Sequence, residues 1–318
     1  MYHNRFNHAQ PLEELYNDLR VQLQMETAEG SQVQMSDMRV DLANNKLFVK
    51  DMPLRLGERA KSVLCERLKI GRIFDVVSKE TMESVLTDIN AGLAVADGFL
   101  TLKVRGDEIQ GVVTERYNDR PYQSLLDMLE HLGARPIRVN QNDQLLRMQA
   151  IFEDRFGVEP SDGKQLNLGV EINTSDMGVG ALKFNVFMYR WVCGNGAIMG
   201  KSSVGSFRTV HVNSMDQAEV DIEHELSRVL TGAQKTVCTL ANDLMAQKYD
   251  STKVVDYLGQ QAIGKKPLAL IVSKIVTSKP STMWDVLNVL TAAGHDPSFS
   301  QSIQQVLETT AGKLLVAA

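Results

Sequence analysis

The chain has 318 residues, of which 43% are hydrophobic and 23% are charged, and its formal net charge is −5. This composition is typical of a globular chain, so it excludes a disordered or fibrous protein. The acidic balance also excludes a nucleic-acid binder that is basic throughout, but a local basic surface is still compatible with it. The length allows one large domain or two smaller ones.

Targeting and redox signals predict a cytoplasmic protein with no membrane partner. The longest apolar run, 267–276, is interrupted by Ser273 and Lys274, so it is too short to cross a bilayer. The first residues lack the apolar stretch of a signal peptide. The three cysteines are an odd number without a CxxC pair, so we expect neither a disulfide framework nor a cysteine zinc site.

Residues 1–97 are expected to form a mixed region of helices and one hairpin. Leucines at helical spacing predict a helix over 11–25. Alternating segments on either side of Asn44-Asn45 predict a hairpin over 38–49. Two more helices are expected, one after Pro53 and one over 80–89.

Residues 98–213 are expected to form a β-rich core. The first two strands, 99–105 and 108–114, flank Gly106-Asp107, which is a two-residue hairpin signal. A helix with apolar residues from Leu125 to Leu132 follows. Further strands are predicted at 136–140, 145–152, 166–172, 181–193 and 206–212.

Residues 214–318 are predicted to be helical. Ser214 and Gln217 have the spacing of a capping box, and the helix that they start could reach Tyr249. Three shorter helices, separated by glycine and proline, are expected after it. Because strictly alternating βαβ units are absent, we predict an α+β fold. Its β-rich central antiparallel sheet with hairpins would lie between a helical N-terminal segment and a helical C-terminal region.

Two segments look like phosphate-binding loops, but neither satisfies the motif. In 194–202 the first glycine is one residue too early. In 259–266 the spacing fits, but Lys266 stands where serine or threonine should bind Mg²⁺. We interpret the first as a turn at a strand end and the second as a helix C-terminus.

Other catalytic motifs are also incomplete. His224-Glu225 begins like a zinc-protease helix, but Arg228 replaces the second histidine, so a solvated helix face is the better interpretation. Cys193 ends an apolar strand, where a small buried hydrophobe is more common than a nucleophile. We therefore predict no catalytic residue, no metal and no cofactor.

The distribution of charge is more informative than its total. The sequence has no acidic residue between Asp176 and Asp216, nor between 260 and 284, and both windows carry basic residues. Basic side chains interleaved with aromatic rings suit single-stranded nucleic acid, because cations follow phosphates and rings stack on bases. The candidate nucleic-acid-binding residues are Lys183, Arg190, Lys201, Arg208, Lys265, Lys266, Tyr189 and Trp191. An alternative stays open: strand 181–193 has large apolar residues on both faces, so it could be buried instead.

The stretch GVEINTSDMGVGALKFNVFMYRWVCGNGAIM (169–199) resembles the signature of a phage/plasmid-like family catalogued as a domain of unknown function. The resembling positions are Tyr189, Arg190, Cys193, Asn195 and Gly196. Segments 53–70, 111–129 and 282–296 resemble other parts of the family in the same order, although Trp191 and Gly194 depart from it. The resemblance implies a protein of phages, prophages and plasmids, acting in the cytoplasm of a bacterial host. A weaker likeness, at the level of fold, is to single-strand annealing proteins of the RecT/Redβ type.

The leading hypothesis is a non-enzymatic, phage-type DNA-binding protein that binds or anneals single-stranded DNA without ATP, in recombination or replication. The alternative is a protein-interaction module that inhibits a host defence or nuclease, which the acidic balance and the 14 methionines would suit. An enzyme acting through Cys193 is the third and weakest reading.

The last 21 residues predict a further partner. Apolar residues from Ile303 to Leu315 recur at helical spacing, and this stripe must be buried on its own domain or on a neighbour. We expect a neighbouring copy, and hence a homo-oligomer that forms a ring or a filament.

Overall fold

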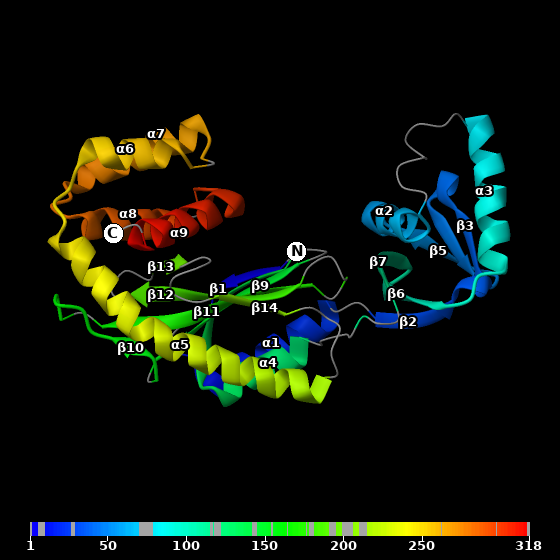
Figure 1. Ribbon diagram of the computed structural model, residues 1–318, viewed down its shortest axis with the longest axis horizontal. Coiled ribbons are helices and arrows are strands. Elements are labelled where there is room, and N and C mark those ends of the chain that lie inside the picture. Colours follow the sequence, from blue (N-terminus) through cyan, green and yellow to red (C-terminus); the bar gives the residue numbers. More distant parts are fainter. Residues whose placement is uncertain are drawn as a thin grey trace.

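The computed structural model shows two lobes, each built on its own sheet (Figure 1). The structure describes residues 2–5, 10–26, 29–69, 79–114, 117, 122–141, 145–153, 155–163, 165–175, 177, 181–190, 195–198, 206–209, 215–261, 263–296 and 298–316. Among these residues, no helix is long and apolar enough to span a membrane.

The large lobe contains an antiparallel sheet, here called the large sheet. Its main path is β1 (Tyr2–Arg5), β8 (Ala134–Gln141), β9 (Leu146–Phe152), β11 (Leu166–Thr174), β12 (Leu182–Arg190) and β13 (Asn195–Ile198). Two short strands join it: β10 (Gly157–Val158) pairs with β11, and β14 (Ser206–Thr209) pairs with β12.

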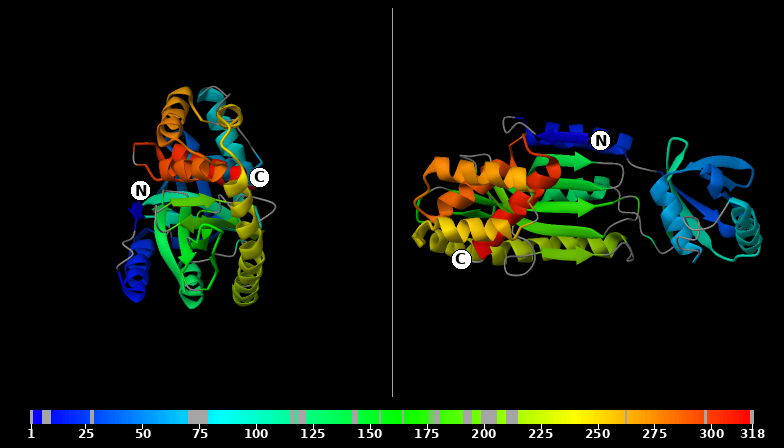
Figure 2. Two further views of the ribbon diagram at one scale, coloured as in Figure 1. Left: turned by 90° about the vertical axis from the view of Figure 1, so that its left-hand side faces the viewer. Right: turned by 90° about the horizontal axis from the view of Figure 1, so that it is seen from above.

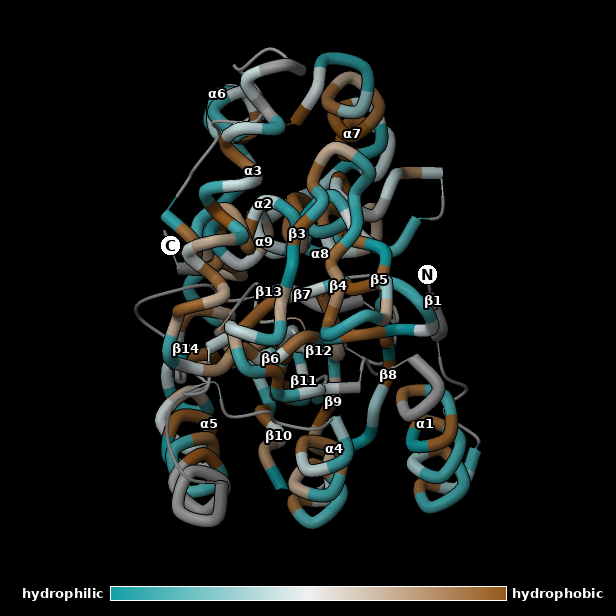
Figure 3. Tube along the Cα trace, turned by 90° about the vertical axis from the view of Figure 1, so that its right-hand side faces the viewer, coloured by the Kyte–Doolittle hydropathy of each residue, from teal (hydrophilic) through white to brown (hydrophobic). Residues whose placement is uncertain are grey.

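Helices cover the large sheet on both sides. Three helices lie side by side along one face (Figure 3): α1 (Leu12–Glu26), α4 (Tyr122–His131) and α5 (Met215–Ala246). The opposite face is covered in part by α8 (Met283–Gly294) and α9 (Gln301–Val316). Outside these two lie α6 (Ser251–Gly259) and α7 (Lys265–Ser278) (Figures 1 and 2).

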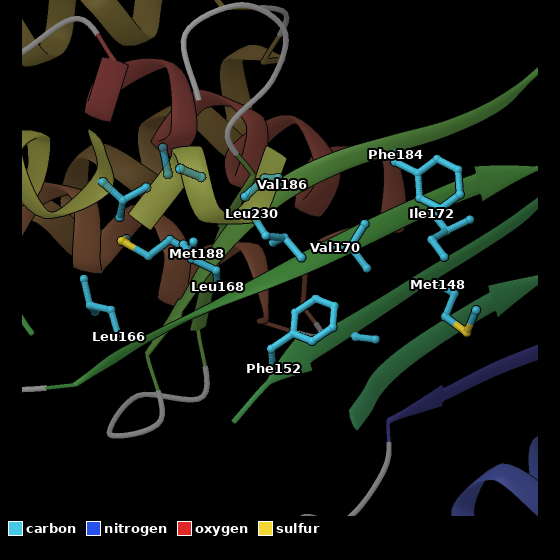
Figure 4. Close-up of a cluster of buried hydrophobic side chains, with 14 of the residues drawn as sticks. Met148, Phe152, Leu166, Leu168, Val170, Ile172, Phe184, Val186, Met188 and Leu230 are labelled. Carbon is cyan, nitrogen blue, oxygen red and sulfur yellow. The ribbon is translucent and has the colours of Figure 1, made fainter. Parts of the chain in front are cut away.

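Every second side chain of the strands packs into the space between the large sheet and α5. Phe184, Val186 and Met188 of β12 point to that side and meet Leu230 of α5, in a core that Figure 4 shows in close-up. Phe187 and Tyr189 point to the α9 side and form a small separate cluster with Ile137 and Ile151. The prediction that both faces of this strand carry large apolar groups agrees with their burial.

The small lobe is built on a six-stranded sheet, here called the small sheet. Its strand order is β2 (Glu29–Gln34), β6 (Phe99–Arg105), β7 (Glu108–Thr114), β5 (Met52–Leu56), β4 (Lys46–Val49) and β3 (Met38–Asp41). All described pairs are antiparallel except the parallel pair of β5 and β7. One face packs against α2 (Glu58–Arg67) and α3 (Lys79–Ala94) in a core separate from that of the large lobe.

The α+β class is confirmed, and so are both predicted hairpins. Asn45 and Gly106 adopt the positive φ values, 53° and 62°, that their tight turns require. The grouping of strands differs from the expectation, however. Hairpin β6–β7 pairs with β2 and β5 of the small sheet, so residues 98–213 are divided between two sheets. Sequence spacing alone does not determine which strand a hairpin pairs with.

Two further elements differ from the sequence prediction. Pro53 lies inside strand β5, not merely before a helix, and residues 52–56 were not predicted as a strand. Four described helices, not three, follow α5. The additional boundary arises because the side chain of Asp250 accepts hydrogen bonds from the backbone N–H groups of Thr252 and Lys253, which starts α6 directly after α5.

The C-terminal stripe packs within its own chain. Leu307, Leu314 and Leu315 of α9 are buried in the core of the large lobe, while Ile303 is partly buried against it. The stripe therefore does not need a neighbouring copy to be covered, and the expected homo-oligomer has no support from it.

The lobes meet at the turn that follows β11. The hydroxyl of Tyr117 donates a hydrogen bond to the carbonyl oxygen of Ser175 at 2.9 Å. Gly111 of β7 packs so closely on this turn that a Cβ atom there would lie 2.6 Å from the carbonyl oxygen of Met177. A side chain at position 111 would therefore push the two lobes apart.

Candidate nucleic-acid interface

The face of the large sheet on the α9 side is unusually polar. Alternation and the strand register bring polar side chains of five strands to this side, which we call the polar face. It comprises Arg138 and Asn140 of β8, Arg147 and Gln149 of β9, Glu171 and Asn173 of β11, Lys183 and Asn185 of β12, and Ser206 and Arg208 of β14.

Helix α9 covers one part of the polar face and places the carboxylate of Glu308 against it. Glu308 is fully buried and bridges two arginines of neighbouring strands. Its Oε1 accepts from Nη1 of Arg138 at 2.7 Å, and its Oε2 accepts from Nη2 of Arg147 at 2.6 Å. Gln304, one turn earlier in α9, accepts from Nη2 of Arg138 at 2.7 Å. These contacts fix the last helix to the sheet through charge-assisted hydrogen bonds.

Gly294 of α8 allows the side chain of Glu308 to pass close to the α8 backbone. A Cβ atom at this position would lie 2.9 Å from Cγ of Glu308, so only glycine leaves room for the glutamate stem.

The second buried carboxylate, Glu171, has all its acceptor positions in use. Its Oε2 accepts from Nε of Arg147 at 2.6 Å and from the amide of Gln149 at 3.1 Å. Its Oε1 accepts from the amides of Asn173 and Asn185. Burial acts to lower the pKa of Arg147, but the charges of Glu171 and Glu308 outweigh burial and raise this pKa above its usual value. Both carboxylates are surrounded by hydrogen-bond donors, an arrangement that suits structure better than proton transfer.

The other end of the polar face is open and carries cations without carboxylate partners. Lys183 of β12 and Arg208 of β14 are directly opposite each other in the register, and both are exposed. Neither forms an ion pair or a side-chain hydrogen bond with any residue that the structure describes. Because the charges of Arg138 and Arg147 balance those of the two buried glutamates, Lys183 and Arg208 give the polar face a net positive charge.

The structure separates the remaining candidate residues. Tyr189 lies on the same side of the sheet as Lys183 but is only 3% exposed, with its ring edge-on to Phe187, so it would have to be uncovered before it could stack on a base. Lys265 and Lys266 are exposed at the start of α7, in the outer helical layer (Figure 1). Lys201, Trp191 and the side chain of Arg190 lie outside the described residues.

Sequence reasoning missed the two arginines that pair with Glu308. Arg138 and Arg147 occur within segments that were predicted as strands, at positions where a cation interrupts an apolar pattern. A cation with an apolar residue on each side of it in the strand was the available signal. Carboxylate partners 161 and 170 residues away could not have been identified from it.

The structure agrees with one interpretation of a failed motif and corrects another. Residues 195–198, which we interpreted as a turn at a strand end, form strand β13 and pair with β12. Segment 259–266 does contain a helix C-terminus, that of α6 at Gly259, but it also contains the start of α7 at Lys265. Arg228 forms an ion pair with Glu225 on an exposed face of α5, as expected for a solvated helix surface. Within the described ranges, no group of histidine, cysteine and carboxylate side chains could hold a metal ion. Cys193 lies outside those ranges.

Comparison with known proteins identifies a family but no activity. No curated protein and no solved structure matches the chain. The profile of a family described as a domain of unknown function, DUF932, matches residues 110–294, which is more than half of the chain. The matched region runs from β7 of the small lobe to the end of α8 and includes every residue of the polar face. The chain therefore belongs to the DUF932 family.

Proposed function

We propose that this protein binds single-stranded DNA at the open end of the polar face, without ATP, as a step in strand annealing during phage-type recombination or replication. The observation that carries the proposal is the exposed cross-strand pair of Lys183 and Arg208. Like charges directly opposite each other destabilise a sheet. An anion between them removes this repulsion, so the pair costs stability in the free protein and is favourable in a complex.

The surroundings of the pair favour a polyanion over a single small anion. Asn173 of β11 is the register partner of Lys183, so Asn173, Lys183 and Arg208 form one row across three adjacent strands. Neighbouring strands lie about 4.8 Å apart, so the row extends over roughly 10 Å. A sugar–phosphate backbone that crosses the strands along this row can place successive phosphates near both cations.

The saturated carboxylates support a binding role over a catalytic one. Glu171 and Glu308 are the acidic side chains placed on the polar face, and each accepts hydrogen bonds from arginine. Single-strand annealing needs charge neutralisation and access to the bases, and neither requirement involves a general base or a nucleotide fuel.

The test is a titration of a labelled 30-nucleotide dT strand, followed by fluorescence anisotropy at several salt concentrations. We expect binding that weakens with salt, because each phosphate contact releases counterions. The double variant Lys183→Ala/Arg208→Ala should reduce the magnitude of the slope of log affinity against log salt by about 1.4, at about 0.7 per contact. Lys253→Ala, which removes an exposed lysine on α6, is the matched control and should leave the slope unchanged.

Either of two results would remove the proposal. One is the absence of salt-dependent binding to the wild-type protein. The other is a salt slope that the double variant does not change while its melting temperature stays that of the wild type.

A further inference from the structure

The outer face of the small sheet carries a basic and aromatic patch on strands β3, β4 and β5. Leu47 and Val40 point into the core beneath α2 and α3, so their neighbours in each strand point outward. The outward residues that define the patch are Arg39, Lys46, Phe48, Pro53 and Arg55. We infer that this patch is a second contact surface for single-stranded nucleic acid, a proposal that rests on the proposed function and extends it to the small lobe.

A stacked cation and ring lie at the centre of the patch. Arg39 and Phe48 are direct cross-strand partners, and the guanidinium carbon lies 3.8 Å from the ring centroid. Phe48 is half-buried but is not part of the core of the small lobe, and Arg39 is exposed. The ring of Phe48 thus holds the planar guanidinium of Arg39 against the sheet, and the other side of the guanidinium is toward solvent. A guanidinium plane presented in this way is a stacking partner for a nucleobase.

The charges next to the stack are arranged for phosphate. Lys46 is exposed in the row next to the Arg39–Phe48 pair, and it forms no ion pair with any residue that the structure describes. Arg55 is the register partner of Lys46 but is paired with Glu108, so it contributes little net charge. The carboxylate of Asp41 is turned toward the backbone and amide of Asn44, in the tight turn between β3 and β4. Lys46 and Arg39 therefore remain as the cations available to an anionic ligand.

This combination distinguishes nucleic acid from an acidic peptide. A peptide carboxylate would need cations alone, and a planar stack would add nothing to its binding. A single nucleic-acid strand offers a base for the Arg39–Phe48 stack and a phosphate for Lys46 within one nucleotide. The proposal therefore makes stacking and charge separable in an experiment.

The experiment uses the full chain and two probes of the same length, a 30-nucleotide dT strand and a strand of abasic sites with the same number of phosphates. Arg39→Lys keeps the charge and removes the planar stack. We expect it to weaken binding to dT on the order of tenfold, the effect of losing one stacked base, and to leave binding to the abasic strand unchanged. Phe48→Leu should behave in the same way, because the guanidinium loses its support.

Lys46→Ala should act differently from both. It should weaken binding to the two probes equally and reduce the salt slope by about 0.7. The control is Arg155→Lys, which alters another exposed arginine whose guanidinium carbon faces a ring, that of Phe156 at 5.3 Å. This control should leave both affinities unchanged.

The outcomes separate this inference from the proposed function. If Lys183→Ala/Arg208→Ala weakens binding but Arg39→Lys and Phe48→Leu do not, the small-lobe patch is refuted and the large-sheet site stands. Equal losses on dT and on the abasic strand for Arg39→Lys would also refute it, because they would show a contact without stacking. If the wild-type protein binds neither probe, both proposals fail.

Discussion

At the scale of single residues, the buried charges predict where the large lobe is most sensitive. Arg138 is 2% exposed, and its removal leaves the fully buried Glu308 with one arginine instead of two. Breaking a buried ion pair on one side typically costs about 3–5 kcal/mol. We expect Arg138→Met to lower the free energy of unfolding by about that amount, measured by urea denaturation monitored by circular dichroism. Arg228→Met, which breaks an exposed pair within α5, should have no measurable effect. Equal effects of the two variants would contradict this view of the cluster.

Glycine at one position of β11 is required by packing. A Cβ atom at Gly169 would lie 2.5 Å from the carbonyl oxygen of Ala150 and 2.5 Å from the ring of Phe187, its cross-strand partner. We expect Gly169→Ala to destabilise the protein by at least about 1–3 kcal/mol, the usual cost of overpacking. Gly92→Ala is the control, because no atom lies within 4 Å of a Cβ there. It should stabilise α3 by about 0.5–1 kcal/mol. The measurement is the melting temperature of each variant, and a decrease in both would contradict the distinction between the two glycines.

At the scale of elements, the start of α8 predicts a dependence on pH. Burial acts to raise the pKa of Asp285, but hydrogen bonds from the side chains and backbone N–H groups of Ser281 and Thr282 outweigh it and lower this pKa. A lowered folded-state pKa stabilises the protein above the unfolded-state value of about 4, and this stabilisation is lost as the pH falls below it. Asp285→Asn removes the charge and should cost about 1 kcal/mol at pH 7. The melting temperatures of variant and wild type should then converge toward pH 3, and a constant difference would contradict the assignment.

The elements that could be predicted from sequence are those with local causes. The turns at Asn45 and Gly106 are specified by residues that tolerate positive φ, so both hairpins were found. Strand β5 was missed because Pro53 argues against a strand, and its backbone pairing with β7 depends on residues more than 50 positions away. The sequence predicted the exposed pair of the polar face only in part. Lys183 and Arg208 were both candidate nucleic-acid-binding residues, but only the strand register shows that they are opposite each other.

At the scale of the whole molecule, separate cores predict separate unfolding. The core of the small lobe, from Val33 to Val112, forms a cluster distinct from that of the large lobe. The sequence offered no signal for the division into two lobes, because hairpin β6–β7 could have joined either sheet. The described contacts between the lobes are few and local, at the turn that holds Ser175 and Met177. Two cores joined in this way need not unfold together.

Differential scanning calorimetry of two matched variants tests this division. Leu64 of α2 and Leu230 of α5 are both fully buried, one in each core. Truncation of a buried leucine to alanine typically costs about 2–5 kcal/mol, which lowers the melting temperature of the cooperative unit that contains it. We expect two transitions, with Leu64→Ala lowering one and Leu230→Ala lowering the other. A single transition that both variants lower would show that the turn at Ser175 couples the lobes into one unit. The polar face and the small-sheet patch would then be fixed relative to each other.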